Sequence, residues 1–297
     1  MLISQGATGP ESAAQQSPAF LRSFELYRVN SSGTVIAMTD DSDFKGYAED
    51  VAYHGQPMIL SDRDRLPHDI AALLVFPVYR DGDVISVVVL AASRCDEAVG
   101  VFEIWEPVGL YEDVRLANGY YPNLERFQNI STFVRFEKGY GLPGQLWKRQ
   151  RAIVQDDLAN HSGFLRAAGA SADSLSIGLG IPVCDDSFIA AVVLLSSQRT
   201  PLARGFEVWV PAGRGFELLE SSYVAEEAEY ALPPGTVLDA DEGLPAMSAR
   251  EEAACVSRQR AVYAPRRETT VGSKIDCGVA IPCYDGVMLT SVVVMLF

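Results

Sequence analysis

The sequence is poor in the residues that build metal and haem centres. It has three histidines and five cysteines among 297 residues, and no two cysteines form a Cys-x-x-Cys pair. Imidazole and thiolate groups are the usual ligands of zinc and of haem iron, so the composition disfavours both kinds of centre. The odd number and wide spacing of the cysteines also disfavour a disulfide framework and indicate a reducing, cytoplasmic setting.

The sequence also lacks a long apolar run and an excess of positive charge. Its most apolar segments, VISVVVLAAS (84–93) and FIAAVVLLSS (188–197), are far shorter than the ~20 residues that span a bilayer, so no membrane partner is expected. The first twenty residues have no basic region and no long apolar stretch, which excludes a signal peptide. The net charge of −15 argues against nucleic acid as a partner, because phosphate binding requires a positive field.

What the sequence does contain is an internal repeat. Three segments read alike, FELYR, FEIWE and FEVWV, and they begin at Phe24, Phe102 and Phe206. Three apolar segments near the other end of each copy carry a proline at equivalent places, Pro77, Pro182 and Pro282. Landmarks in one order at a nearly constant period predict three copies of one module. The predicted division is a flexible lead (1–19), an abbreviated module (20–99), a full module (100–203) and a third module (204–297).

The middle copy predicts the fold of the module. Strands are expected at 101–107, 112–121 and 130–139, followed by a helix that Pro143 opens. A short strand at 151–158, a helix over 163–173 and a hairpin of two buried strands complete the order β-β-β-α-β-α-β-β. Asp-Gly turns in the first and third copies favour such hairpins. The predicted class is α+β, with three modules that each hold a largely antiparallel sheet flanked by helices. No long helix links the copies, so they are expected to pack directly as a compact or rod-like array.

The middle copy resembles the GAF domain, a sensory module related in shape to PAS domains. The resemblance is carried by FEKGYGLPGQLW (136–147), RAIVQDDL (151–158) and FLRAAGASADSLSIGLGIPV (164–183). It is strong over 101–200 and fair over 204–297, while over 20–95 it depends on the repeat. It implies a central antiparallel sheet with a small-molecule pocket under loops that bear helices. Known occupants in the family include cyclic nucleotides, linear tetrapyrroles, haem and small metabolites, but many members bind nothing and mediate protein contacts.

The resemblance places a candidate ligand site in the middle module. The expected lining and polar contacts are Trp147, Asp157, His161, Phe164, Arg166, Ile177 and Leu179. A covalently attached bilin needs a cysteine, usually beside a histidine, in the helical region of this module. That region contains His161 and no cysteine, so covalent bilin and haem are both disfavoured. The identity of a cofactor or ligand stays open.

Three functions remain. The first is a sensory, regulatory protein that binds a small molecule in the middle module and signals through a protein partner. The alternative is an interaction or dimerisation scaffold that binds no ligand, with a protein partner or a second copy of itself. The third is an enzyme similar to the cysteine-based methionine sulfoxide reductases, which would use Cys184 and Cys283. No catalytic motif is found, so an enzyme is not expected. The sequence ends within an expected strand, and whether the natural chain continues beyond Phe297 stays open.

Overall fold

The computed structural model describes residues 19–40, 42–109, 111–265, 267 and 272–297, and the statements below concern these residues. The expected flexible lead, residues 1–19, lies outside them apart from Ala19. No helix of the described part is long and apolar enough to cross a membrane. All five cysteines are free thiols.

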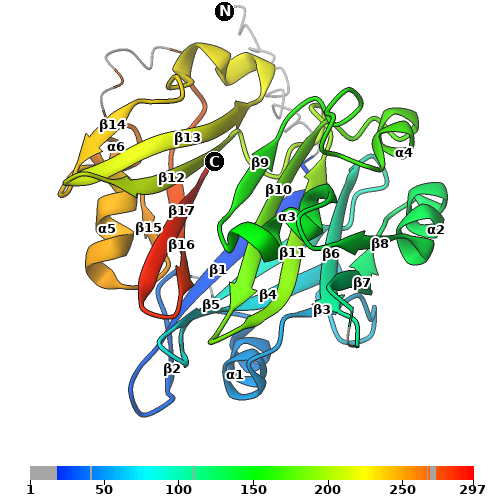
Figure 1. Ribbon diagram of the computed structural model, residues 1–297, viewed down its shortest axis with the longest axis horizontal. Helices are drawn as coiled ribbons and strands as arrows, with labels where there is room; N and C mark the ends of the chain where they lie inside the picture. Colours follow the sequence, from blue (N-terminus) through cyan, green and yellow to red (C-terminus); the bar gives the residue numbers. More distant parts are fainter. Residues whose placement is uncertain (1–18, 41, 110, 266, 268–271) are drawn as a thin grey trace, which may run out of the picture.

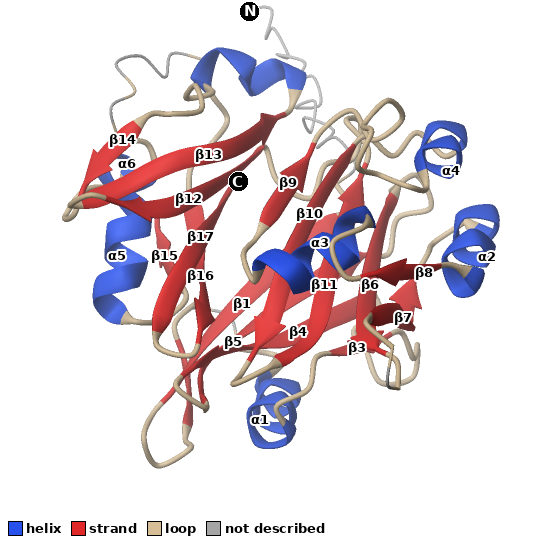
Figure 2. Ribbon diagram, in the orientation of Figure 1, coloured by secondary structure: helices blue, strands red, loops and turns tan. Residues whose placement is uncertain are grey.

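The strands form three antiparallel sheets (Figures 1 and 2). The first sheet contains β1 (Leu21–Val29), β2 (Val35–Ala37), β3 (Met58–Leu60), β4 (Ile70–Arg80) and β5 (Asp83–Ser93). The second contains β6 (Gly100–Pro107), β7 (Asp113–Tyr120), β8 (Arg135–Glu137), β9 (Ile153–Gln155), β10 (Ile177–Cys184) and β11 (Phe188–Ser196). The third contains β12 (Gly205–Ala212), β13 (Gly215–Tyr223), β14 (Val237–Asp239), β15 (Cys255–Ser257), β16 (Gly278–Asp285) and β17 (Met288–Leu296). The α+β class predicted from the sequence is consistent with these sheets.

The helices lie outside the sheets (Figure 2). They are α1 (Lys45–His54), α2 (Glu125–Phe133), α3 (Gly141–Arg149), α4 (Ala167–Ala172), the 3₁₀ helix η1 (Ala225–Tyr230), α5 (Gly243–Glu251) and α6 (Arg260–Tyr263). The strand predicted at 130–139 was partly wrong, because its first residues end α2 and only Arg135–Glu137 pairs in the sheet. Phe127 and Ser131 are the buried residues of α2, and their spacing of four is that of one helix face.

The strand order is the same in all three sheets. The second sheet has the order β8-β7-β6-β11-β10-β9, and the third repeats it as β14-β13-β12-β17-β16-β15. The first sheet, β2-β1-β5-β4-β3, matches these orders with one edge strand fewer. The predicted hairpins are confirmed, since β4 pairs with β5, β10 with β11 and β16 with β17. The turn between β4 and β5 uses Asp81 and Gly82, both at positive φ, as a tight hairpin turn requires.

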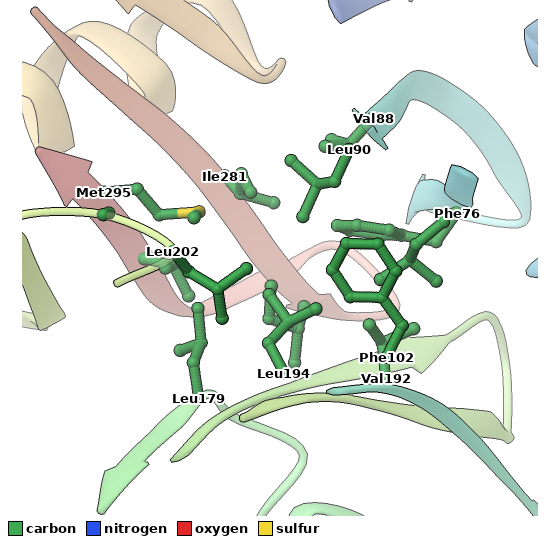
Figure 3. Close-up of a cluster of buried hydrophobic side chains, with 14 of the residues drawn as sticks. Phe76, Val88, Leu90, Phe102, Leu179, Val192, Leu194, Leu202, Ile281 and Met295 are labelled. Carbon is green, nitrogen blue, oxygen red and sulfur yellow. The ribbon is translucent and has the colours of Figure 1, made fainter. Parts of the chain in front are cut away.

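Each sheet is buried on both faces. The outer face of every sheet packs under its own helices and forms a separate apolar cluster. The inner faces meet in one shared core, which includes Phe76 of β4, Leu179 of β10 and Ile281 of β16 (Figure 3). Burial on both faces explains why β10 is buried along its whole length instead of showing an alternating pattern.

The sheets form a closed ring around the shared core. The strands β4, β10 and β16, which hold equivalent places in the three sheets, contact one another. The edge strand β3 packs against β6 and β7 of the second sheet, and β9 packs against β12 and β13 of the third. The third sheet closes the ring through ion pairs with the first, Arg28 with Glu251 and Arg80 with Glu252. A repeated head-to-tail contact of this kind closes when three copies complete the turn.

The contacts between neighbouring sheets are called seams below. Two of the three seams contain an equivalent hydrogen bond. The backbone N–H of Ala152, just before β9, donates to Ser291 Oγ in β17 at 3.0 Å. The backbone N–H of Ala254, just before β15, donates to Ser86 Oγ in β5 at 3.1 Å. Each bond satisfies a buried backbone donor that no strand pairing reaches.

The remaining seam, between the first and second sheets, carries neither partner of this hydrogen bond. Pro57 stands just before β3, where Ala152 stands before β9, and proline has no N–H to donate. Ala190 takes the position in β11 that Ser291 takes in β17, because each pairs with the residue after the repeated proline. Loss of the acceptor therefore accompanies loss of the donor.

Candidate functional site

The second sheet buries a glutamate beneath its helices. Glu103 lies in β6 between Phe102 and Ile104, whose side chains belong to the shared core, so Glu103 points to the outer face. Its side chain is fully buried. Trp105, two residues along the same face, donates its indole N–H to Glu103 Oε2 at 2.9 Å. Tyr121 donates its hydroxyl to Oε1 at 2.8 Å.

Arg166 supplies the counter-charge of Glu103. It precedes α4, and its side chain is 1% exposed. Nη2 donates to Glu103 Oε2 at 2.8 Å, while Nη1 donates to Oε1 and to Ser131 Oγ. Such a bidentate pair fixes the orientation of both planar groups and satisfies most of their hydrogen-bonding capacity.

Aromatic rings surround the Arg166 guanidinium. Its Cζ lies 4.7 Å from the ring centroid of Phe127 and 5.1 Å from that of Trp105. Phe164 and Phe136 lie at 5.2 and 5.8 Å. A cation held over aromatic faces away from water is attracted by their quadrupoles. The space beneath the helices, where the resemblance implies a ligand, therefore holds a side chain of the protein itself.

The third sheet repeats this arrangement. Glu207 of β12 accepts from the indole N–H of Trp209 at 2.8 Å and from the hydroxyl of Tyr223. Arg267 pairs with Glu207 and also donates through Nε to the carbonyl of Tyr230 at 2.7 Å. Burial alone would lower the pKa of Arg267, but the charges of Glu207 and Tyr223 and the hydrogen bonds to both together outweigh this effect, so the pKa is raised. Arg267 is therefore held in its charged form.

The first sheet holds its glutamate differently. Glu25 of β1 is buried and accepts hydrogen bonds from the Tyr27 hydroxyl and from the backbone N–H groups of Asp43 and Phe44, at 2.9 and 3.2 Å. No cation pairs with Glu25 within the described ranges. The two N–H groups lie just before α1, where the helix dipole also favours a negative charge.

Two of the predicted site residues come together and two others do not. The ring of Phe164 lies against the Arg166 guanidinium, which pairs with Glu103. Ile177 and Leu179 belong to the shared core and point away from that site, so their placement in one lining with Arg166 is corrected. The glycines between and after them face the helices: a Cβ on Gly180 would lie 2.6 Å from a side-chain atom of Leu146.

The other three predicted residues make local contacts. The half-buried Trp147 stacks on Phe188 with ring centroids 5.4 Å apart. Asp157 is exposed and accepts from the Asn160 side chain at 3.0 Å. His161 accepts the N–H of Gly163 through Nδ1 at 3.1 Å. These contacts do not include the Arg166 guanidinium.

Glu103, at the centre of the site, was not among the residues predicted from the sequence. A signal was present, because the segments beginning at Phe24, Phe102 and Phe206 all place a glutamate second and an aromatic residue fourth. A charged residue inside an otherwise apolar strand requires a buried partner. The repeated glutamate therefore marks the site as well as the copies.

The two cysteines proposed for redox chemistry are buried. Burial raises the pKa of both the Cys184 and the Cys283 thiol to about 12, and at Cys184 the nearby Cys283 adds to the shift. The reactive form of cysteine is the thiolate, which thus forms only at strongly alkaline pH. This environment disfavours the reductase function.

The chain was compared with known proteins. No protein-family model matches it, and no curated protein sequence matches it. Solved structures that resemble part of it include the A. aeolicus nlh2 GAF domain in an inactive state, at 19% identity and TM-score 0.28 over 33% of this chain and 58% of that one. Another is the free methionine-R-sulfoxide reductase of Neisseria meningitidis in complex with its substrate. It has 16% identity and a TM-score of 0.26 over 34% of this chain and 52% of that one. A third is a Staphylococcus aureus NreA protein mutated in its nitrate binding site. It has 15% identity and a TM-score of 0.28 over 34% of this chain and 74% of that one. The chain thus spans little more than half the length of the first two.

Proposed function

We propose that the chain is a non-enzymatic regulatory scaffold made of three GAF-like modules, residues 20–99, 100–203 and 204–297, which presents its outer surface to a protein partner or to a second copy of itself. The observation that carries this proposal is the Arg166 guanidinium, which fills the interior of the middle module and pairs with Glu103. A reducing, cytoplasmic setting is part of the proposal, since all five cysteines are free.

Support for three related modules comes from equivalent positions. The strand order repeats from sheet to sheet, and each sheet buries a glutamate on the outer face of its first strand. In each copy the aromatic residue two positions later donates to this glutamate. Such a specific buried interaction at one place in three sheets is expected of copies of one ancestral unit.

Energetics favour the scaffold over a sensor that uses the module interior. Removing one partner of a buried ion pair typically costs about 3–5 kcal/mol, because the other charge stays buried without compensation. A ligand that displaced Arg166 from Glu103 would have to offset this cost before it gained affinity. The filled interiors of the second and third modules therefore act as structural cores.

The small-molecule sensor is the second candidate, and one observation favours it. Arg166 Nε is buried without a hydrogen-bond partner in the described structure, and so is Nη1 of Arg267. A buried donor left unpaired costs about 1–3 kcal/mol, which an acceptor on a ligand would recover. In this reading Trp147, Asp157, His161 and Phe164 would move toward Arg166 around the ligand.

Native mass spectrometry with an absorption spectrum of the same sample tests the proposal. We expect a mass of 32.2 kDa per chain, or a multiple of it, with no adduct that depends on Arg166. The comparison variant is Arg166→Lys, which keeps the charge but loses the bidentate geometry. An adduct present in the wild-type protein and absent from the variant would overturn the scaffold proposal in favour of sensing. An adduct retained by both proteins would show that the ligand binds elsewhere, and the proposal that Arg166 fills the interior of the middle module would be retained.

A further inference from the structure

The seam between the third and first sheets differs from the other two because β2 is short. β2 has three residues and ends at Ala37, whereas β7 and β13 have eight and nine and continue to Tyr120 and Tyr223. The burial of the phenylalanine in the repeated segment differs accordingly. Phe102 and Phe206 are fully buried, but Phe24 is only half-buried. The shorter strand therefore leaves Phe24 accessible.

In the second sheet, the continued strand covers the equivalent ring. Tyr120 pairs with Phe102 across the two strands, and their ring centroids lie 6.4 Å apart. In the first sheet, Met38 still bonds to β1, through its N–H to the carbonyl of Leu26, but no strand continues beyond it. Thr39 and Asp40 instead line an open groove.

The groove has a volume of about 490 Å³ and lies between the first and third sheets. Its apolar wall is made by Leu21, Phe24, Met38, Val256 and Phe297. Phe24 and Phe297 stack on each other with centroids 4.8 Å apart and planes at 25°. Both the volume and the position between packed units are typical of small-molecule sites, which usually measure about 300–1,000 Å³.

Cations and acids line this groove together, although the protein as a whole is acidic. A neighbouring hollow shares Leu21 and Phe297 with it. The described residues that line the two hollows include five cations, Arg22, Arg199, Arg204, Arg258 and Lys274, and three acids, Asp40, Asp276 and Glu226. The whole chain has 39 acidic residues against 24 lysines and arginines. With Asp69 and Glu227, which pair with Arg22 and Arg204, the charges around the two hollows balance, so an anion meets less repulsion here than over the rest of the molecule.

The arginines differ in whether their charge is already paired with a carboxylate. Arg22 pairs with Asp69 at 3.2 Å, and Arg204 pairs with Glu227 at 3.7 Å. Arg258 is exposed and forms no ion pair within the part of the chain that the structure describes. It is the cation at the groove best placed to meet a negative group.

We propose that this groove binds a small anionic molecule that carries an aromatic ring. The ring packs against the accessible surface of the Phe24–Phe297 pair, because aromatic rings prefer offset or edge contacts with other rings. The anionic group lies at the rim beside Arg258. This inference is independent of the scaffold proposal, because it concerns a seam and not the interior of a module.

A fluorescence titration with 8-anilinonaphthalene-1-sulfonate tests the site. This probe is an anion with aromatic rings, and its emission rises when it leaves water. We expect saturable binding of one probe per chain to the full-length protein. Arg258→Glu should weaken this binding about tenfold, which corresponds to about 1.4 kcal/mol. Met38→Trp, which fills the groove with a large side chain, should abolish it.

The control variant is Arg115→Glu, which makes the same charge change at an exposed arginine on β7, outside both hollows. Its binding should equal that of the wild-type protein. If Met38→Trp does not fold, as judged by near-ultraviolet circular dichroism, Ser23→Phe fills the same groove from β1. The proposal is overturned if the wild-type protein shows no saturable binding. It is also overturned if Arg258→Glu and the groove-filling variant bind the probe as well as Arg115→Glu does.

Discussion

The first and second sheets bury the same glutamate and stabilise it by different means. In the second sheet, Glu103 is paired with Arg166, which lies 63 residues further along the chain. In the first sheet, Glu25 is held by backbone N–H groups 18 and 19 residues away, at the start of α1. One solution uses a charged side chain from a distant loop, and the other uses the polar end of a nearby helix.

This difference explains how the first copy tolerates a shorter chain. The connection that carries Arg166 between β9 and β10 is shorter in the first copy, where it joins β3 to β4, and within the described residues it supplies no cation to Glu25. The helix start at Asp43 and Phe44 provides hydrogen-bond donors without a counter-ion. The abbreviated copy therefore keeps the glutamate with a shorter form of the segment that neutralises it in the other two sheets.

The largest effect is expected from Arg166→Met. The substitution leaves Glu103 buried without a cation, so the free energy of unfolding should fall by about 3–5 kcal/mol. Chemical denaturation followed by tryptophan fluorescence measures this change. The control is Arg135→Met, since Arg135 is 59% exposed and pairs with Asp113 at only 3.6 Å. An exposed pair of this kind contributes about 0–1 kcal/mol.

A second substitution separates the charge from the packing. In the double variant Arg166→Met with Glu103→Gln, no buried charge is left unpaired, so part of the lost stability should return. If the double variant is less stable than Arg166→Met alone, the ion pair is not the reason for the loss.

Glu25→Gln should have a smaller effect than Glu103→Gln. At Glu25 the change weakens hydrogen bonds to a charged acceptor, which contribute about 1.5–3 kcal/mol, and strands no cation. At Glu103 it leaves Arg166 buried and unpaired. The same denaturation experiment compares the two variants, and equal losses would contradict the different environments of the two carboxylates.

The seams provide a third comparison. Ser291→Ala leaves the buried N–H of Ala152 without its acceptor and should cost about 1–3 kcal/mol. Ala190→Ser adds a hydroxyl at the equivalent position of the seam formed by Pro57, where no N–H exists to use it. We expect no gain in stability from this change in a thermal melt, and a clear gain would show that another donor reaches the position.

The last effect is expected only at alkaline pH and concerns Tyr121. Burial, followed by the charge of Glu103, raises its pKa above the usual value near 10. Its contribution to stability is fully present below pH ~10 and is lost as the pH rises beyond that value, because the unfolded state then releases the proton first. Tyr121→Phe should reduce the slope with which the free energy of unfolding falls above pH 10, by about 1.4 kcal/mol per pH unit.

Unfolding free energies between pH 9 and 11.5 test this dependence on pH. Tyr140→Phe is the control, because Tyr140 is 63% exposed. Equal slopes for both variants and the wild-type protein would mean that Tyr121 releases its proton in the folded state.

The sequence predicted local pairing better than the relation between copies. Asp81 and Gly82 specify a tight turn, so the hairpin of β4 and β5 followed from two residues. The ring could not be predicted, because it depends on how the inner faces of three sheets meet. Burial on both faces also hid the alternation in β10, so the residue pattern did not show that Ile177 and Leu179 face the shared core. Phe164 and Arg166 were placed in the site, but their partner Glu103 lies in a strand far away in sequence.

The closed ring has a consequence for how the chain could be rearranged. Because the third sheet packs on the first as the first packs on the second, no seam depends on which sheet comes first in the chain. Leu21 and Phe297 line the same groove, so a short linker there would join the described ends. A circular permutant that opens between the second and third sheets, near Thr200, would keep every seam, although the chain would begin with a different sheet.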